Sequence, residues 1–122
     1  MAEESIRVGP NDRGPRPSAP EGFVTVAKTS DVPEGAIKYV DVGGVPVALC
    51  RVGGELFAVG NLCTHDGGPL SGGSLEDHAI ECPRHGARFD VRDGHVVCLP
   101  AAAPIPSYAV RVEHDQIQVK VR

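Results

Sequence analysis

The chain has few aromatic residues, 4% of the total, and it has no tryptophan. Its core must therefore be built mainly from Val, Ala, Leu and Ile, which an overall hydrophobic content of 41% allows. A length of 122 residues suits one domain and is too short for two. We therefore expect one domain with an aliphatic core.

Features that would place the chain at a membrane or on nucleic acid are also missing. No apolar run approaches the length of a membrane span, and the acidic start, residues 1–5 (MAEES), lacks the basic and apolar segments of a signal peptide. The net charge is −4, from 16 acidic and 12 basic residues, whereas nucleic-acid binding favours a clustered basic face. We expect a cytoplasmic protein that binds neither a membrane nor nucleic acid.

Short runs of alternating apolar and polar residues fill the chain from Phe23 onward. Gly-Gly and Asp-Gly pairs separate several of these runs, which is typical of β-hairpins. Apart from one helical turn at Ser30–Glu34, no helix is indicated, and the pattern predicts an all-β sandwich or barrel. The expected strands are Phe23–Lys28, Ile37–Val42, Val45–Val52, Glu55–Val59, Ala87–Val91, His95–Leu99, Tyr108–Val112 and Ile117–Val121.

Two short segments each place a cysteine close to a histidine. We call them the first hook, Cys63–His65 (CTH), and the second hook, Cys82–His85 (CPRH). A structural zinc site usually draws a Cys-Cys pair from one place, so one thiolate and one imidazole per segment is an unusual division for zinc. It suits a two-metal cluster between two loops, with one iron on the cysteines and the other on the histidines, as in a Rieske [2Fe–2S] centre. The candidate cofactor-binding and metal ligands are Cys63, His65, Cys82 and His85.

The charge of such a centre explains why it mixes its ligands. Four thiolates would give the oxidised cluster a net negative charge, whereas two thiolates and two neutral imidazoles leave it close to neutral. An added electron is then accepted more easily, and the reduction potential is higher than that of an all-cysteine cluster.

The two hooks resemble the signature of the Rieske family, C-x-H followed at a distance by C-x-x-H. The stretches Ala87–Asp90 (ARFD) and Leu99–Ala101 (LPA) are similar to the Rieske-type ferredoxins of bacterial oxygenase systems, and the resemblance extends over residues 23–121. It implies one [2Fe–2S] cluster per chain and a Rieske-like β sandwich or barrel.

The chain divides into a leader and a domain. Residues 1–20 are rich in proline without any period, and we expect them to form a flexible leader. Residues 21–122 form the single Rieske domain. Since the hooks fall in its turn-rich middle, we expect a small cluster-binding subdomain, about residues 60–90, inserted in the larger β domain and carrying the hooks at its tip.

Some residues of this sequence differ from those of respiratory Rieske proteins, and these differences affect the expected reduction potential of the cluster. Respiratory Rieske proteins carry an extra cysteine in each loop, and the two form a disulfide; the equivalent positions here are Gly68 and Arg84. A Ser and a Tyr that hydrogen-bond to the cluster sulfurs in those proteins are replaced by Ala87 and Phe89. Fewer such hydrogen bonds stabilise the reduced cluster less, so we expect a potential towards roughly −150 mV, the lower end of the Rieske range.

The resemblance implies a soluble ferredoxin that passes single electrons from a flavin-dependent NAD(P)H reductase to a terminal non-haem iron oxygenase. The sequence shows no nucleotide-binding fingerprint, no 2-His-1-carboxylate iron site and no catalytic triad, so we expect an electron-transfer component and not an enzyme. A monomer that meets both proteins transiently fits this role.

Two other functions stay open. One is a Rieske-fold accessory protein or small subunit, of a nitrite reductase-like system or of iron–sulfur assembly. The other is a zinc-stapled structural binding module.

The remaining cysteines and histidines show no paired ligand spacing. Cys50 and Cys98 lie in strand-like apolar runs, and we expect both to be buried side chains without a role in the cluster. We expect the other histidines at the surface: His78, His95 and His114.

Overall fold

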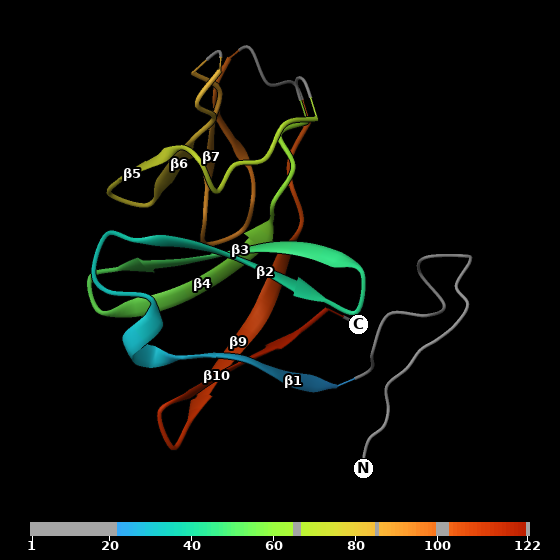
Figure 1. The fold of residues 1–122 in the computed structure, drawn as a ribbon. Coiled ribbons are helices and arrows are strands. Elements are labelled where there is room, and N and C mark those ends of the chain that lie inside the picture. Colours follow the sequence, from blue (N-terminus) through green and yellow to red (C-terminus); the bar gives the residue numbers. More distant parts are fainter. Residues whose placement is uncertain (1–21, 65–66, 85, 100–102, 122) are drawn as a thin grey trace.

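The computed structural model describes residues 22–64, 67–84, 86–99 and 103–121 (Figure 1). The expected leader and the two hook histidines, His65 and His85, lie outside the described residues. The described part of the chain is built from strands and one short 3-10 turn, and none of its helices could cross a membrane. The prediction of an all-β fold is confirmed. The elements are β1 (Phe23–Lys28), η1 (Thr29–Asp31), β2 (Ile37–Val42), β3 (Val45–Val52), β4 (Glu55–Gly60), β5 (Ser74–Glu76), β6 (Ala79–Glu81), β7 (Arg88–Asp90), β8 (Val96–Cys98), β9 (Ser107–Glu113) and β10 (Gln116–Lys120).

The larger sheet has six antiparallel strands in the order β1-β10-β9-β4-β3-β2. Its outer strands β1 and β2 also contact one another, so the sheet curls into a nearly closed barrel. The interior of the barrel is aliphatic, as the shortage of aromatic residues predicts. Its buried residues are Val32, Val40, Val42, Val45, Val47, Leu49, Ala58, Ile117 and Val119.

The smaller sheet contains β5, β6, β7 and β8 in sequence order and lies between β4 and β9 in the chain. It stands on one end of the barrel, at the top of Figure 1. A second buried cluster joins the two sheets, because it combines side chains of β3 and β4 with side chains of the small sheet and its loops. Its members are Ala48, Cys50, Val59, Cys63, Leu70, Ile80, Cys82, Ala87, Phe89, Val91 and Ile105.

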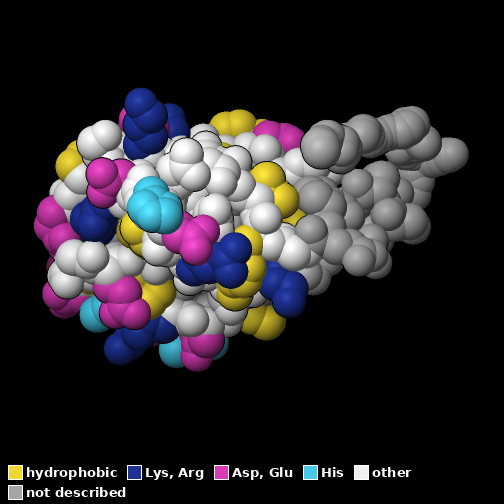
Figure 2. Space-filling view, turned by 90° about the horizontal axis from the view of Figure 1, so that it is seen from below, with side chains coloured by type: hydrophobic (Ala, Val, Ile, Leu, Met, Phe, Trp, Pro, Cys, Tyr) yellow, Lys and Arg dark blue, Asp and Glu magenta, His cyan; other side chains and the backbone are white. Residues whose placement is uncertain are grey.

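The opposite end of the molecule, seen in Figure 2, is a mixed polar surface. Basic and acidic side chains are interspersed over this face, with single apolar side chains between them. The face in view therefore presents neighbouring charges of both signs, which offset one another at short range.

A buried carboxylate closes the turn between β7 and β8. Asp90 is only 6% exposed, and its two oxygens accept hydrogen bonds from the Arg92 backbone N–H (2.8 Å), Nε (3.0 Å) and Nη2 (2.7 Å). The side-chain hydrogen bond from Arg92 is the main cause that lowers the pKa of Asp90 from 3.8 to about 2. The ionised carboxylate is therefore the form that stabilises the fold.

This shift predicts how stability depends on pH. Because the folded pKa lies below the unfolded one, the stabilisation is complete above pH 3.8 and is lost as the pH falls towards about 2. We expect Asp90→Asn to lower the free energy of unfolding by about 1 kcal/mol at pH 7, since the exposed Arg92 guanidinium leaves the pair partly screened by solvent, with the difference shrinking below about pH 4. Urea unfolding at a series of pH values measures this. Asp93→Asn, at an exposed carboxylate in the same turn, is the control, and an equal loss in both variants would contradict the prediction.

Candidate metal centre

The first hook begins where the chain leaves the barrel. At the end of β4, the Gly60 N–H donates to the Pro106 carbonyl (2.9 Å) and the Asn61 N–H donates to the Pro46 carbonyl (3.0 Å). A Cβ atom at Gly60 would lie 2.9 Å from Pro106 Cγ, so only glycine allows this close approach. The barrel therefore fixes the chain just before Cys63.

The two hook cysteines lie in loops with the same backbone hydrogen bonds. In each loop the cysteine N–H donates to the carbonyl five residues ahead, and the cysteine carbonyl accepts from the N–H four residues ahead. That fourth residue is a glycine with positive φ in both loops, 76° in the first and 78° in the second, a conformation that favours glycine. The bonds are Cys63 to Gly68 (2.8 Å), Gly67 to Cys63 (2.7 Å), Cys82 to Ala87 (2.7 Å) and Gly86 to Cys82 (3.2 Å).

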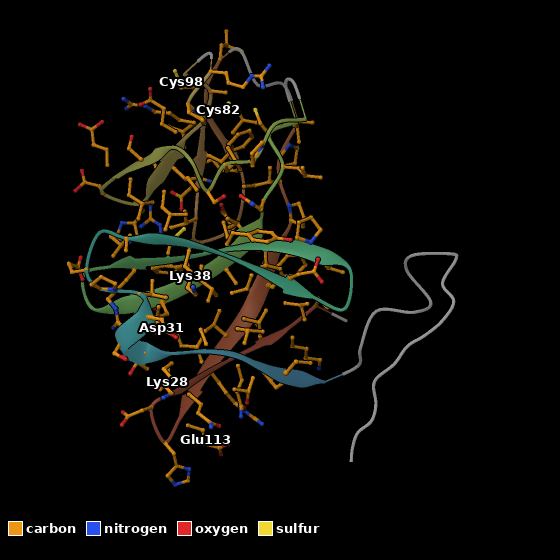
Figure 3. The ribbon with its side chains drawn as sticks, viewed as in Figure 1. Lys28, Asp31, Lys38, Cys82, Cys98 and Glu113 are labelled. Carbon is orange, nitrogen blue, oxygen red and sulfur yellow. The ribbon has the colours of Figure 1, made fainter. Side chains whose placement is uncertain are left out.

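Both cysteine side chains are buried. Cys63 and Cys82 are each 1% exposed and belong to the same buried cluster between the sheets. Figure 3 shows Cys82 at the end of the small sheet that points away from the barrel. Neither of them is in a disulfide bond. A thiolate in such apolar surroundings needs a cation beside it, so the pair fits a soft metal centre.

The described residues thus contain two of the four predicted ligands and place them in matching loops. Within that part of the chain, no three His, Cys, Asp or Glu side chains gather into another arrangement that could hold a metal ion. The histidines of the two hooks are outside it, and their role remains a prediction.

The two other cysteines have different environments. Cys50, on β3, is fully buried, and desolvation raises its pKa to about 12, so it stays a neutral thiol. Cys98 is exposed, and the prediction that it is buried was wrong. The apolar run Val96–Cys98 forms β8, an edge strand of only three residues, and its last two side chains face solvent.

The other described histidines belong to neither hook. His95 and His114 are exposed, as expected, and His95 Nδ1 lies 2.6 Å from Asp93 Oδ1. His78 is half-buried, because its ring packs edge-on against Phe57 with the ring centroids 5.6 Å apart.

An ion-pair network supports the strands around the second hook. The Arg88 guanidinium lies 3.0 Å from a carboxylate oxygen of Glu81, its cross-strand neighbour, and 3.0 Å from one of Glu76. The hydrogen bond with Glu81 is the main cause that raises the pKa of Arg88. Since all three side chains are partly exposed, the network contributes little stability. The network joins β5, β6 and β7 across the small sheet, next to the start of the second hook.

The segment after residue 102 packs against the first hook. The Thr64 hydroxyl, next to Cys63, donates to the Ala103 carbonyl (2.6 Å). The Ile105 N–H donates to the Gly94 carbonyl (2.9 Å), and the Ile105 side chain is 3% exposed. The segment 103–105 therefore connects the first hook to the turn between β7 and β8, and the sequence pattern alone did not single out Thr64.

Comparison with known proteins agrees with this geometry. The family model described as the Rieske [2Fe-2S] domain matches residues 22–109. The ferredoxin component of the naphthalene 1,2-dioxygenase/salicylate 5-hydroxylase systems of a Ralstonia species is 40% identical over 101 residues, which cover 83% of this chain and 97% of the relative. The solved ferredoxin of carbazole 1,9a-dioxygenase from Nocardioides aromaticivorans IC177 superposes with a TM-score of 0.79 at 35% identity, covering 82% of this chain and 98% of that one. A solved complex of reduced oxygenase and oxidised ferredoxin in carbazole 1,9a-dioxygenase contains a chain with a TM-score of 0.76 and 35% identity, covering 80% of this chain and 92% of that one.

Proposed function

The chain belongs to the Rieske [2Fe–2S] domain family, and on that premise we propose that the cysteines of the two hooks bind one iron of the cluster and the histidines the other. The observation that supports this assignment is the matching pair of buried cysteine loops at the end of the small sheet. Zinc, the alternative raised by the sequence, would not need two loops of this mixed composition. The proposed ligands are Cys63, His65, Cys82 and His85.

When bound, the cluster takes up and releases one electron at a time. Side chains of the protein form the environment of the cluster. Leu70, Ile80 and Phe89 are fully buried beside the cysteines and exclude water from the sulfur side. Ala87 and Phe89 have no hydroxyl group to donate to a cluster sulfur. The reduced state is therefore less stabilised, and we propose a potential at the low end of the Rieske range.

The protein is an electron-transfer component of a dioxygenase system and not a catalyst itself, like the ferredoxin components to which it is similar. We propose that a flavin-dependent NAD(P)H reductase reduces it and that a terminal non-haem iron oxygenase oxidises it. The similarity to a ferredoxin solved together with its oxygenase supports the second partner. Transient contact with two proteins in turn favours a monomer, which we place in the cytoplasm.

The cofactor assignment is tested by EPR of the dithionite-reduced protein together with iron and acid-labile sulfide analysis. We expect a rhombic Rieske-type signal and equal amounts of iron and sulfide. A silent spectrum with stoichiometric zinc would refute the assignment.

Electron transfer is tested next, by adding the protein to a flavoprotein reductase, NADH and a ring-hydroxylating oxygenase. Product should form only when the ferredoxin is present, and equal product without it would refute the carrier role.

The proposed histidine ligands lead to a separate prediction about the midpoint potential of the cluster. We expect His65→Cys or His85→Cys, where the cluster still assembles, to lower the midpoint potential by roughly 100 mV, because each adds a negative charge to the centre and moves it towards an all-cysteine ferredoxin. A redox titration followed by EPR measures the shift. His114→Cys, in the turn at the opposite end of the barrel, is the matched control. An unchanged potential in both hook variants would count against the assignment.

A further inference from the structure

Asn61 is one of two polar residues buried in the described part of the chain, the other being Asp90. It is 3% exposed and lies two residues before Cys63. Its side chain makes two hydrogen bonds to Ser71: Oδ1 accepts from the Ser71 N–H (2.7 Å), and Nδ2 donates to Ser71 Oγ (3.2 Å). The Asn61 side chain therefore closes the loop that contains the first hook.

The far end of this loop rests on the strand that carries the second hook. After Ser71 the chain turns at Gly73, whose N–H donates to the Leu70 carbonyl (2.9 Å). Gly73 lies so close to β6 that an added Cβ would be 1.8 Å from the Glu81 carbonyl oxygen. Glu81 directly precedes Cys82. The contacts thus connect Asn61, two residues before the first hook, with Glu81, the residue before the second hook.

The disulfide that links the two loops in respiratory Rieske proteins cannot form here, because Gly68 and Arg84 stand at the equivalent positions. We propose that Asn61 is a positioning residue that, through Ser71, holds the two cysteines at the separation the cluster requires. This proposal rests on the proposed ligand set. A neutral amide suits the task, because it accepts a hydrogen bond from the partly buried Ser71 N–H without adding charge near a centre that must accept an electron.

Three substitutions test this role. Asn61→Leu keeps the size of the side chain but removes both hydrogen bonds and leaves the Ser71 N–H unpaired. Asn61→Asp keeps both bonds, since a carboxylate can accept from the Ser71 N–H and from its hydroxyl, but adds a negative charge. Gln118→Met is the matched control, because it removes an amide that bonds to Arg111 and Thr25 on the barrel. Each protein is examined for its reduced EPR spectrum, its midpoint potential and the rate of cluster loss to a chelator in air.

We expect Asn61→Leu to lose its cluster roughly tenfold faster than the parent protein, because an unpaired, partly buried N–H costs about 1.4 kcal/mol. Its reduced EPR spectrum should show broadened or shifted g-values. Asn61→Asp should keep the parent's rate of cluster loss within about twofold while its potential falls, and Gln118→Met should match the parent in all three measurements. A role limited to folding stability would leave the g-values and the potential unchanged.

The proposal is overturned if Asn61→Leu retains the parent's g-values and rate, or if Asn61→Asp loses the cluster as fast as Asn61→Leu. Should Asn61→Leu not accumulate, Asn61→Ala takes its place, since a water molecule can then bond to the Ser71 N–H and preserve the fold. For Asn61→Ala, too, unchanged g-values and an unchanged rate of cluster loss would overturn the proposal. If the proposed ligand set is wrong, the parent protein itself will give no Rieske-type EPR signal, and this is known before any variant is compared.

Discussion

Replacing Cys82 by alanine is expected to remove the [2Fe–2S] cluster completely and to leave a colourless protein. The variant would offer one thiolate where one iron needs two, and the loop around it excludes water and other donors. Backbone bonds, not the thiol, close this loop, so the small sheet should persist. Iron analysis and the visible absorption spectrum measure the loss, and circular dichroism checks the fold.

The chain offers two matched controls for this prediction. Cys98→Ala changes an exposed thiol on the same small sheet, and Cys50→Ala changes a buried thiol in the same cluster of side chains. We expect both to keep the iron content of the parent, with Cys50→Ala losing about 1 kcal/mol of stability to the cavity it creates. Full iron content in Cys82→Ala, or loss of iron in Cys98→Ala, would contradict the proposed ligands.

We expect Gly73→Ala to destabilise the small sheet strongly. The added Cβ would lie 1.8 Å from the Glu81 carbonyl oxygen and 3.2 Å from that of Leu70, and both are backbone atoms that cannot rotate away. Overpacking that shifts the backbone typically costs about 1–3 kcal/mol, and a clash this short with backbone atoms should cost about 3 kcal/mol. Because β6 leads directly into Cys82, the cluster content should fall as well. Thermal unfolding and iron analysis measure the two effects.

The neighbouring glycine is the control. A Cβ at Gly72 would meet only Pro83 Cγ, at 3.9 Å, which is ordinary van der Waals contact. We therefore expect Gly72→Ala to change stability by less than about 1 kcal/mol, since alanine mainly reduces the freedom of the unfolded chain. Equal behaviour of the two variants would show that the packing of the first-hook loop on β6 is not tight.

The sequence predicted the hairpins of the barrel well because their turns have a strict requirement. Ile37–Val42 and Val45–Val52 are strands with the expected bounds, and Gly43 and Gly44 between them have φ of 61° and 91°. A two-residue turn with both φ positive favours glycine, so the Gly-Gly pair was a direct signal.

The hairpin of β5 and β6 was missed for the opposite reason. Its strands, Ser74–Glu76 and Ala79–Glu81, have three residues each, too few to show a period of two. Its turn has no glycine, and Asp77 takes the positive φ of 53° instead. Aspartate tolerates that conformation but is common in many other settings, so it gave no distinctive signal.

The same contrast applies to the site. The spacing of cysteine and histidine within each hook is a local property, and it was sufficient to propose all four ligands. The bond from Asn61 to Ser71 and the bond from Thr64 to Ala103 depend on how separate loops fold together, and no local pattern encodes them. A polar residue at the end of the apolar strand Glu55–Gly60 was the one available hint of Asn61.

The connection between the two sheets has a consequence for protein engineering. β4 and β9 are neighbours in the barrel, paired at Ala58 with Tyr108 and at Val59 with Ser107, and all of the small sheet lies between them in the chain. The chain thus leaves and re-enters the barrel at adjacent points, joined by the bond from Gly60 to Pro106. Residues 61–105 are in this sense a cassette with its two ends side by side. We expect that such a cassette can be exchanged with that of another Rieske protein whose side chains fit Ala48, Cys50 and Val59 of the barrel, which would alter the electron centre while the barrel is kept.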